Sequence, residues 1–323
     1  MRVVITGGTG FVGRHLAAHC AKRGDDVMVT YRPGGDTHDE TATAVDLPKS
    51  AQTVALEVTD AGSVSQLMGL LQPDVVYHLA ALTFVPEAEG AEAIVSNVNV
   101  GGTQAIVSAI KEKSPKTRLV YVSSSEIYGA PRPSALPLRE TSELRPANIY
   151  GWSKAAADLY CHSAAFRYGL DIVRVRPFPH IGPGQSPRFA LSGFAKQLAQ
   201  VKLGKAEPII KVGNLEAKRD YTDVSDIVRG YRDAALNARK GESYNFCSGK
   251  SFSIGELLQM LIKASGVEVE VVEDPSRLRV SDIPDSYGSA DLAQRDFGWK
   301  PRIELESALH GLFAFWVEYT HRS

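Results

Sequence analysis

The stretch T-G-G-T-G-F-V-G, residues 6–13, decides the fold of this chain. It contains the motif G-x-G-x-x-G as Gly8, Gly10 and Gly13. An apolar run at residues 2–6 precedes it, and residues 11–23 follow with a helical pattern. Between a strand and a helix, such glycines let the backbone approach a pyrophosphate, and the helix N-terminus favours its negative charge. The stretch therefore predicts a dinucleotide site.

The rest of the first half alternates short apolar runs with amphipathic segments. Strands are expected at residues 2–6, 27–31, 53–58, 75–79 and 119–123, and helices at residues 11–23, 63–71 and 91–113. Continuous apolar strands separated by helices are typical of a parallel sheet that is covered on both faces. The pattern predicts an α/β fold, a doubly wound Rossmann sheet, with ligands at the carboxyl ends of its strands.

The character of the sequence changes after residue 176. Prolines and glycines crowd residues 177–187, which predicts a shaped loop. Helices are expected at residues 192–203, 254–264 and 304–319, and a strand at residues 244–247. We expect a dinucleotide-binding domain at 1–176, with segments near 220–248 returning to it. Residues 177–323 should then form mainly a smaller substrate-binding domain.

The composition excludes several classes of protein. The 323 residues carry a formal net charge of -1, so attraction to nucleic acid or to an anionic membrane is not expected. No run reaches the roughly 20 apolar residues of a membrane span. Cys20, Cys161 and Cys247 lie far apart, which argues against disulfides and a zinc site and favours free thiols in the cytoplasm. No metal site is predicted, and His78 is expected to have a structural role.

The catalytic candidates come from two segments. Y-G-W-S-K places Tyr150 and Lys154 four residues apart, on one face of a helix. A nearby ammonium lowers the pKa of a phenol, which would let Tyr150 exchange a proton with a carbonyl or carbinol oxygen. Upstream, V-S-S-S-E-I-Y-G follows a strand, and the Ser124 hydroxyl there could bond the same oxygen.

With these motifs in order, the chain resembles the extended short-chain dehydrogenase/reductase family, also called the NAD-dependent epimerase/dehydratase family. The resemblance covers nearly the whole length and implies a catalytic triad of Ser124, Tyr150 and Lys154, acting on a nucleotide-activated sugar. Within the family, R-P-F-P-H-I-G-P-G-Q at 176–185 and G-N-L-E-A-K-R-D at 213–220 are most similar to GDP-4-keto-6-deoxy-mannose reductases, which form GDP-rhamnose. GDP-mannose 4,6-dehydratases are next.

The resemblance and the glycine loop together imply a set of cofactor contacts. The expected cofactor-binding residues are Gly7, Gly10, Phe11, Val12, Gly13, Arg32, Glu57, Val58, Leu79, Ala80, Ala81, Asn99, Tyr150, Lys154 and Pro177. NAD sites usually carry an acidic residue at the end of the second strand, but here Arg32 follows it and could pair with a 2'-phosphate. NADP(H) is therefore favoured over NAD(H).

The implied substrate site is less regular. Its expected residues are Ser124, Ser125, Glu126, Pro179, Lys196, Val212, Arg219 and Arg279, with the two arginines on the diphosphate. The family usually has Asn where this chain has Pro179, and proline offers no amide or backbone donor. Pro179 therefore departs from the family pattern at this contact.

Glu126 leaves the reaction open. The resemblance implies that a dehydratase needs a glutamate there as an extra acid or base, yet reductases of this branch also carry one. Reduction is favoured, and a 4,6-dehydratase, another nucleotide-sugar epimerase or decarboxylase, or a non-enzymatic dinucleotide sensor are the alternatives. Relatives commonly dimerise through helices equivalent to residues 91–113 and 149–168, so a homodimer is expected.

Overall fold

A seven-stranded parallel sheet forms the centre of the molecule. The computed structural model describes residues 1–34, 41–83, 90–277 and 283–322. The strands are β1 (Arg2–Thr6), β2 (Asp26–Tyr31), β3 (Gln52–Ala55), β4 (Val75–His78), β5 (Arg118–Val122), β6 (Ile172–Pro177) and β11 (Ser243–Phe246). Their order is β11-β6-β5-β4-β1-β2-β3, and every pairing is parallel. This confirms the predicted Rossmann sheet.

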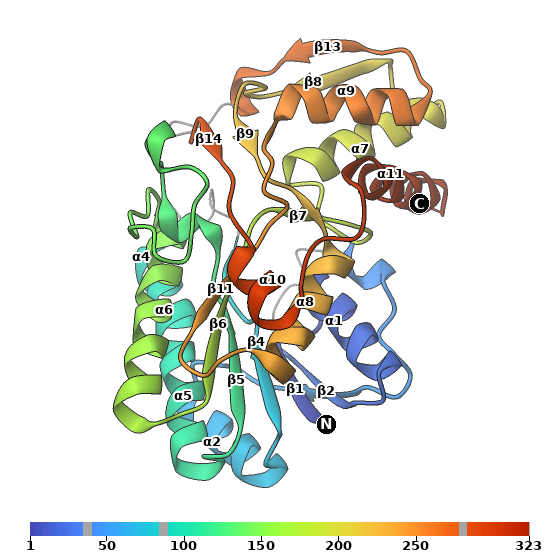
Figure 1. Ribbon diagram of the computed structural model, residues 1–323. Coiled ribbons are helices and arrows are strands. Elements are labelled where there is room, and N and C mark those ends of the chain that lie inside the picture. Colours follow the sequence, from blue (N-terminus) through green and yellow to red (C-terminus); the bar gives the residue numbers. More distant parts are fainter. Residues whose placement is uncertain (35–40, 84–89, 278–282, 323) are drawn as a thin grey trace.

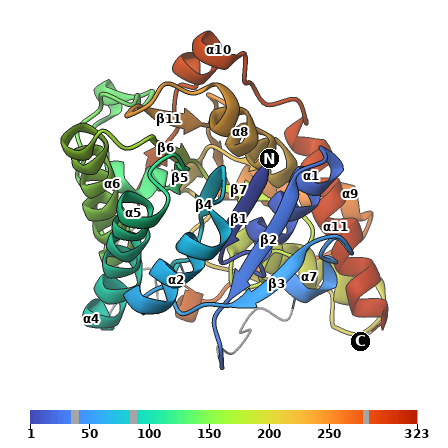
Figure 2. The same ribbon diagram turned by 90° about the horizontal axis from the view of Figure 1, so that it is seen from below.

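Helices cover both faces of the sheet (Figures 1 and 2). The helices on one face are α2 (Ala61–Leu71), α5 (Gly102–Lys113) and α6 (Ile149–Tyr168), and those on the other are α1 (Phe11–Lys22) and α8 (Val224–Asn237). Successive residues of a strand point to opposite faces. Val3 and Ile5 accordingly belong to the core beneath α1 and α8, whereas Val4 belongs to the core beneath α2 and α5. Because both faces are covered, successive residues of β1 must all be apolar, which explains its continuous apolar run.

Two predicted elements differ from the structure. The strand expected at 53–58 is β3, which ends at Ala55, because the chain turns toward Asp60, the N-cap of α2. The helix expected at 91–113 is interrupted: α4 (Glu92–Val95) passes through a π-helical segment, Ser96–Gly101, into α5. The segment Glu92–Lys113 is long and apolar enough to cross a membrane, but half of its apolar window is buried, as in a core helix.

The predictions missed β6, whose sequence I-V-R-V-R-P places two arginines in a fully buried strand. An alternating charge is typical of a strand with one exposed face, yet Arg174 and Arg176 are 6% and 3% exposed. Their partner is the carboxylate of Asp158 on α6. A carboxylate from another element thus makes a charged strand fit the middle of the sheet.

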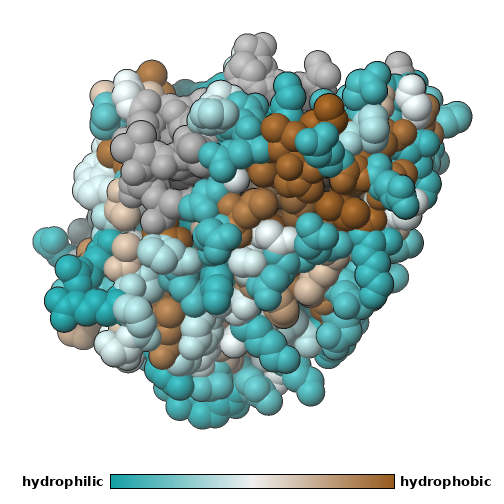
Figure 3. Space-filling view, turned by 90° about the horizontal axis from the view of Figure 1, so that it is seen from above, coloured by the Kyte–Doolittle hydropathy of each residue, from teal (hydrophilic) through white to brown (hydrophobic). Residues whose placement is uncertain are grey.

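A smaller layer lies above the carboxyl ends of the strands (Figure 1). Its helices are α7 (Ala190–Lys202), α9 (Ile254–Ser265) and α11 (Leu305–Arg322), which share a core that includes Leu198, Leu258 and Trp316. The pair β8 (Ile209–Val212) and β13 (Glu270–Glu273) lies outside them. Figure 3 looks onto this end, where an apolar patch interrupts a mostly polar surface, and exposed Ile209 and Val272 belong to that strand pair.

Short strands connect the two layers. They are β7 (His180–Ile181), β9 (Lys218–Arg219), β10 (Thr222–Asp223), β12 (Phe252–Ser253) and β14 (Asp285–Ser286). β7 pairs with β10, and β9 lies between β12 and β14. Helix α10 (Asp291–Phe297) then packs beside α8 and β11. These connections hold the proline-rich loop and Arg219 above the sheet edge.

Candidate active site

The phosphate loop is built from backbone that approaches other backbone. Gly7 has φ +66°, and a Cβ there would lie 2.9 Å from Ala80 Cα. A Cβ on Gly13 would lie 2.5 Å from the Gly7 carbonyl oxygen. Side chains at either position would push the loop away from β4 or from the start of α1. The glycines therefore keep the turn closed on itself.

Gly10 differs from these glycines because a Cβ there would meet only the Gly7 carbonyl oxygen, at 3.4 Å. Gly10 is also the N-cap of α1, which within the described residues has no side-chain cap, and no acidic residue lies in its first turn. In the part of the chain that the structure describes, no side-chain acceptor thus competes for the first amides of α1. This is the cradle that a pyrophosphate fits.

Other expected cofactor residues surround the same edge. Arg32 is exposed just beyond β2, and Glu57 and Val58 lie in the loop after β3, where Glu57 accepts hydrogen bonds from Thr59. Leu79, Ala80 and Ala81 follow β4, and Pro177 ends β6.

Asn99 and His78 have their side chains engaged by the protein itself. Asn99 Nδ2 donates to the Leu82 carbonyl (3.1 Å) and to Ser153 Oγ (2.9 Å), and Oδ1 accepts from the Leu82 amide. The amide of Asn99 has two donors and both are used, so a direct cofactor contact stays a prediction. His78 lies between the Thr6 and Thr103 hydroxyls, and burial lowers its pKa to about 3. A neutral structural histidine fits this position.

Ser124 and Tyr150 meet above the end of β5. Ser124 caps the 3-10 turn Ser125–Tyr128, where its Oγ accepts from the Glu126 amide at 3.2 Å. Burial raises the pKa of Tyr150 to about 12, while a hydrogen bond with Ser124 lowers it and the Glu126 charge raises it. The expected lowering of this pKa is wrong for the structure. A phenol is protonated at neutral pH and can give its proton to an oxygen on which negative charge develops.

Lys154 is buried one helical turn beyond Tyr150. Its ammonium donates to the Val122 carbonyl at 2.6 Å and lies 5.1 Å from the centre of the Tyr121 ring. Burial lowers its pKa to about 8, and the charge of Asp158 opposes that shift. Because the ammonium is held by β5 and not by the phenol, Lys154 does not lower the pKa of Tyr150 here.

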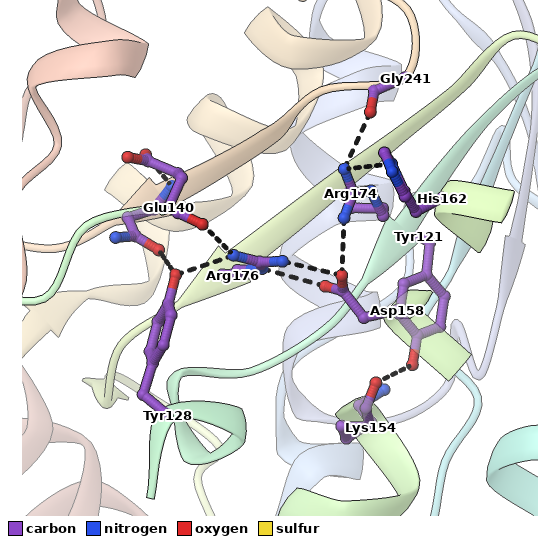
Figure 4. Close-up of polar contacts among 10 residues, drawn as sticks. Tyr121, Tyr128, Glu140, Lys154, Asp158, His162, Arg174, Arg176 and Gly241 are labelled. Carbon is purple, nitrogen blue, oxygen red and sulfur yellow. Dashed lines mark hydrogen bonds and ion pairs between the residues drawn. The ribbon is translucent and has the colours of Figure 1, made fainter. Parts of the chain in front are cut away.

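Asp158, one further turn along α6, is the centre of a buried network (Figure 4). Arg176 donates to both carboxylate oxygens of Asp158, at 2.9 and 3.0 Å, and to the hydroxyl of Tyr128 at 3.1 Å. Arg174 also donates to Asp158 and to the Gly241 carbonyl. Burial raises the pKa of Asp158, but the two arginines outweigh it, so the net shift is downward. The network ties the helix of Tyr150 and Lys154 to the turn of Ser124 and Glu126.

Glu126 is half-buried and close to the start of α6. Its Oε2 accepts from Asn148 Nδ2 at 2.9 Å, and Asn148 Oδ1 in turn accepts from the Gly151 amide at 2.7 Å. Ser125 is buried beside it. The structure thus brings Ser124, Glu126 and Tyr150 together, with Lys154 behind them.

The expected substrate residues of the second half are more dispersed. Half-buried Pro179 accepts the Thr222 amide through its carbonyl at 3.0 Å, and Val212 is buried in the core of the smaller layer. The Lys196 ammonium lies 5.6 Å from the Trp316 ring centre. The Arg219 guanidinium donates to the Lys218 and Ile283 carbonyls. Arg279 lies outside the described residues.

Asn148 and Asp158 were not predicted from the sequence as parts of the site, and Arg176 was predicted only as the start of a motif. Asn148 could have been found locally, because an Asn directly before a helix is an N-cap signal. Asp158 carried a weaker signal: it lies four residues after Lys154 and therefore on the same helix face.

Comparison with known proteins agrees with this geometry. The model of the family described as GDP-mannose 4,6 dehydratase matches residues 4–311. GDP-6-deoxy-D-mannose reductase of Pseudomonas aeruginosa is 33% identical over 98% of this chain and 97% of that protein. UDP-glucose 4-epimerase of Streptomyces lividans is 28% identical over 93% of this chain and 91% of its own length.

A solved structure extends the likeness to three dimensions. RMD from Pseudomonas aeruginosa complexed with NADPH superposes with a TM-score of 0.84 at 29% identity, covering 99% of this chain and 100% of that one. The chain therefore belongs to the GDP-mannose 4,6 dehydratase family of extended short-chain dehydrogenases/reductases, and is an enzyme that uses a nicotinamide dinucleotide on a nucleotide sugar.

Proposed function

We propose that the protein uses NADPH to reduce the C4 ketone of a GDP-linked 4-keto-6-deoxyhexose, in the manner of a GDP-rhamnose-forming reductase. The observation that carries this proposal is geometric: the phenol of Tyr150 is hydrogen-bonded to Ser124 at the same sheet edge as the phosphate loop. Net reduction of a ketone needs one hydride and one proton, and this arrangement provides the proton. The 33% identity to a GDP-6-deoxy-D-mannose reductase supports the substrate class.

The residues divide the chemistry between them. The nicotinamide cofactor, when bound on the phosphate loop, supplies the hydride. Ser124 donates a hydrogen bond that orients the substrate carbonyl, and Tyr150 gives its proton to the same oxygen as charge develops there. Lys154 keeps a positive charge behind this oxygen, and its ammonium is positioned by the Val122 carbonyl. Arg219, with the arginine at 279, would hold the diphosphate.

NADPH is the proposed form of the cofactor because a cation, Arg32, lies where an NAD site usually has a carboxylate. The observation that RMD was solved with NADPH supports the same choice. Titration of the protein with NADPH and NADH tests it directly. Tighter binding of NADH would refute the preference without touching the reaction.

A dehydratase is the second candidate, and Glu126 favours it. Its carboxylate lies close enough to Tyr150 to raise the pKa of the phenol. A dehydratase oxidises C4, expels the C6 hydroxyl and returns the hydride, so it needs no added reductant. Mass analysis of products from GDP-mannose and from the keto sugar, each with and without NADPH, separates the two. Reduction only of the keto sugar, with stoichiometric loss of NADPH, is expected, and conversion of GDP-mannose without NADPH would overturn it.

We also propose a homodimer in which α6 of each copy contributes to the interface. Trp152, Leu159 and Phe166 are 43%, 54% and 91% exposed and recur every seven residues, so they form one apolar stripe on α6. Exposed Ile94 lies on neighbouring α4. Such a stripe is suited to burial against its own copy. Light scattering should give twice the chain mass, and the Phe166→Lys protein should be a monomer.

A further inference from the structure

One side chain, Asn148, links the two segments that carry the catalytic candidates. It is the N-cap of α6, with its Oδ1 accepting the Gly151 amide at 2.7 Å. Through Nδ2 it donates to Glu126 Oε2 at 2.9 Å. The same amide group therefore orients the first turn of α6, which contains Tyr150, and the carboxylate of the neighbouring turn.

The backbone makes this link rigid. A Cβ on Gly151 would lie 2.7 Å from the Glu126 carbonyl oxygen, so the start of α6 packs directly on the turn that carries Glu126. Ser124 Oγ accepts the Glu126 amide from the other side. Glu126 is thus fixed at its backbone and at one carboxylate oxygen, while the residue remains half-exposed and close enough to Tyr150 for its charge to raise the pKa of the phenol.

A carboxylate held in this way serves best as a fixed acceptor. A dehydratase would need Glu126 to take a proton and turn toward a new partner, whereas a reductase needs only a stationary acceptor for a sugar hydroxyl.

We propose that Asn148 is a positioning residue that holds Glu126 as a hydrogen-bond acceptor for the sugar and thereby favours net reduction over dehydration. This inference rests on the proposed function. The step that Asn148 suppresses is removal of the C5 proton by the carboxylate of Glu126, which gives a protonated Glu126 and the enolate of the 4-ketone. Return of a deuteron from D2O would regenerate the ketone with deuterium at C5.

The first test uses Asn148→Ser. Serine keeps a side-chain acceptor for the helix cap but is too short to replace the amide donor at Glu126. We expect the KM for the keto sugar to rise about 10-fold, the size expected for one hydrogen bond to a charged group, with kcat changed less than about 3-fold. In D2O with NADP+, the variant should exchange the C5 proton, measured by NMR, at least about 10-fold faster than the wild type.

The second test exchanges donor and acceptor. Asn148→Asp faces Glu126 with a second carboxylate, so it should raise the KM further and lower the melting temperature below that of the wild type. In the double variant Asn148→Asp/Glu126→Gln, the new amide can donate to the new carboxylate, so the melting temperature should return to that of Glu126→Gln alone. A purely structural cap predicts no loss of melting temperature in Asn148→Asp alone, and so nothing to rescue, because Asp caps α6 in both backgrounds.

The outcomes separate the two proposals. If the wild type reduces the keto sugar but Asn148→Ser has an unchanged KM and no C5 exchange, the positioning role is refuted and the proposed function stands. If the wild type fails to reduce the keto sugar, both are refuted.

Discussion

The phosphate loop and the catalytic face of α6 lie at the same edge of the sheet but are built in opposite ways. The loop is contiguous, residues 6–13, and its shape depends on the absence of side chains at Gly7 and Gly13. The catalytic face depends on side chains from several elements, with Asp158 bonded to two arginines from β6. One region is sensitive to an added methyl group, and the other to a lost charge or hydroxyl.

This difference explains which changes each region tolerates. A site formed by backbone atoms is disrupted by an added side chain, but it should keep its function when surrounding charges change. A side-chain site keeps its shape when one hydroxyl is removed, but it loses its chemistry. Four experiments follow from this contrast, from the largest expected effect to the smallest.

Removal of one hydroxyl at the catalytic face should have the largest effect. In Tyr150→Phe, kcat for reduction should fall about 100- to 10,000-fold, because the proton donor is lost. NADPH binding should stay unchanged, since the phosphate loop is untouched. Tyr160→Phe, on the same helix, is the matched control and should retain activity. Undiminished turnover of Tyr150→Phe would rule out its catalytic role.

Loss of the buried charge should reduce stability. Asp158→Asn leaves Arg174 and Arg176 without their carboxylate, so the free energy of unfolding should fall by about 3–5 kcal/mol in urea titrations. The control is Asp171→Asn, which breaks the more exposed pair with Arg118 (2.9 Å) and should cost about 1 kcal/mol or less. Equal losses in the two variants would show that the Asp158 network has no special role.

The phosphate loop should respond to one methyl group. In Gly10→Ala the new Cβ would make only an ordinary van der Waals contact, 3.4 Å from the Gly7 carbonyl oxygen, so the melting temperature should hold, while the Kd for NADPH rises about 10- to 100-fold from steric overlap. In Gly13→Ala the Cβ would meet the Gly7 carbonyl at 2.5 Å, so the fold itself should be destabilised. Unchanged NADPH binding by a folded Gly10→Ala protein would place the pyrophosphate elsewhere.

The pH dependence should give the smallest effect, about tenfold per pH unit. Burial lowers the pKa of Lys154 to about 8, so its positive charge, and with it kcat/KM, should be lost as the pH rises above about 8. Tyr150 stays protonated through this range. Lys154 keeps its proton up to a pKa near 10.5 in the unfolded chain but only up to about 8 in the folded one. Through this group, the free energy of unfolding should therefore rise as the pH increases from 8 to 10.5.

Activity and stability should therefore move in opposite directions in that window, which distinguishes titration from unfolding. In Lys154→Arg the alkaline decline should move to higher pH, since a guanidinium keeps its charge. A decline at the same pH in both proteins would assign it to another group.

Local patterns in the sequence predicted much of the site. The glycine loop, the serine after β5 and the Tyr–Lys pair were predicted, and the structure places the serine beside Tyr150. The charged strand β6 was not predicted, because the partner of Arg174 and Arg176 is Asp158, on a different element. The lowered pKa expected for Tyr150 was wrong for the same kind of reason: burial in the folded chain raises the pKa of the phenol, and the Lys154 ammonium bonds to β5.

By itself, then, the sequence determined the parallel sheet, the phosphate loop and the residues that carry the chemistry, because these depend on neighbours along the chain and on backbone freedom. Only the tertiary structure decided which form Tyr150 and Lys154 take and which groups hold them, since burial and long-range partners set those pKa values. The amide of Asn148 and the carboxylate of Glu126, 22 residues apart in sequence, meet only after α6 has packed on the turn beyond β5.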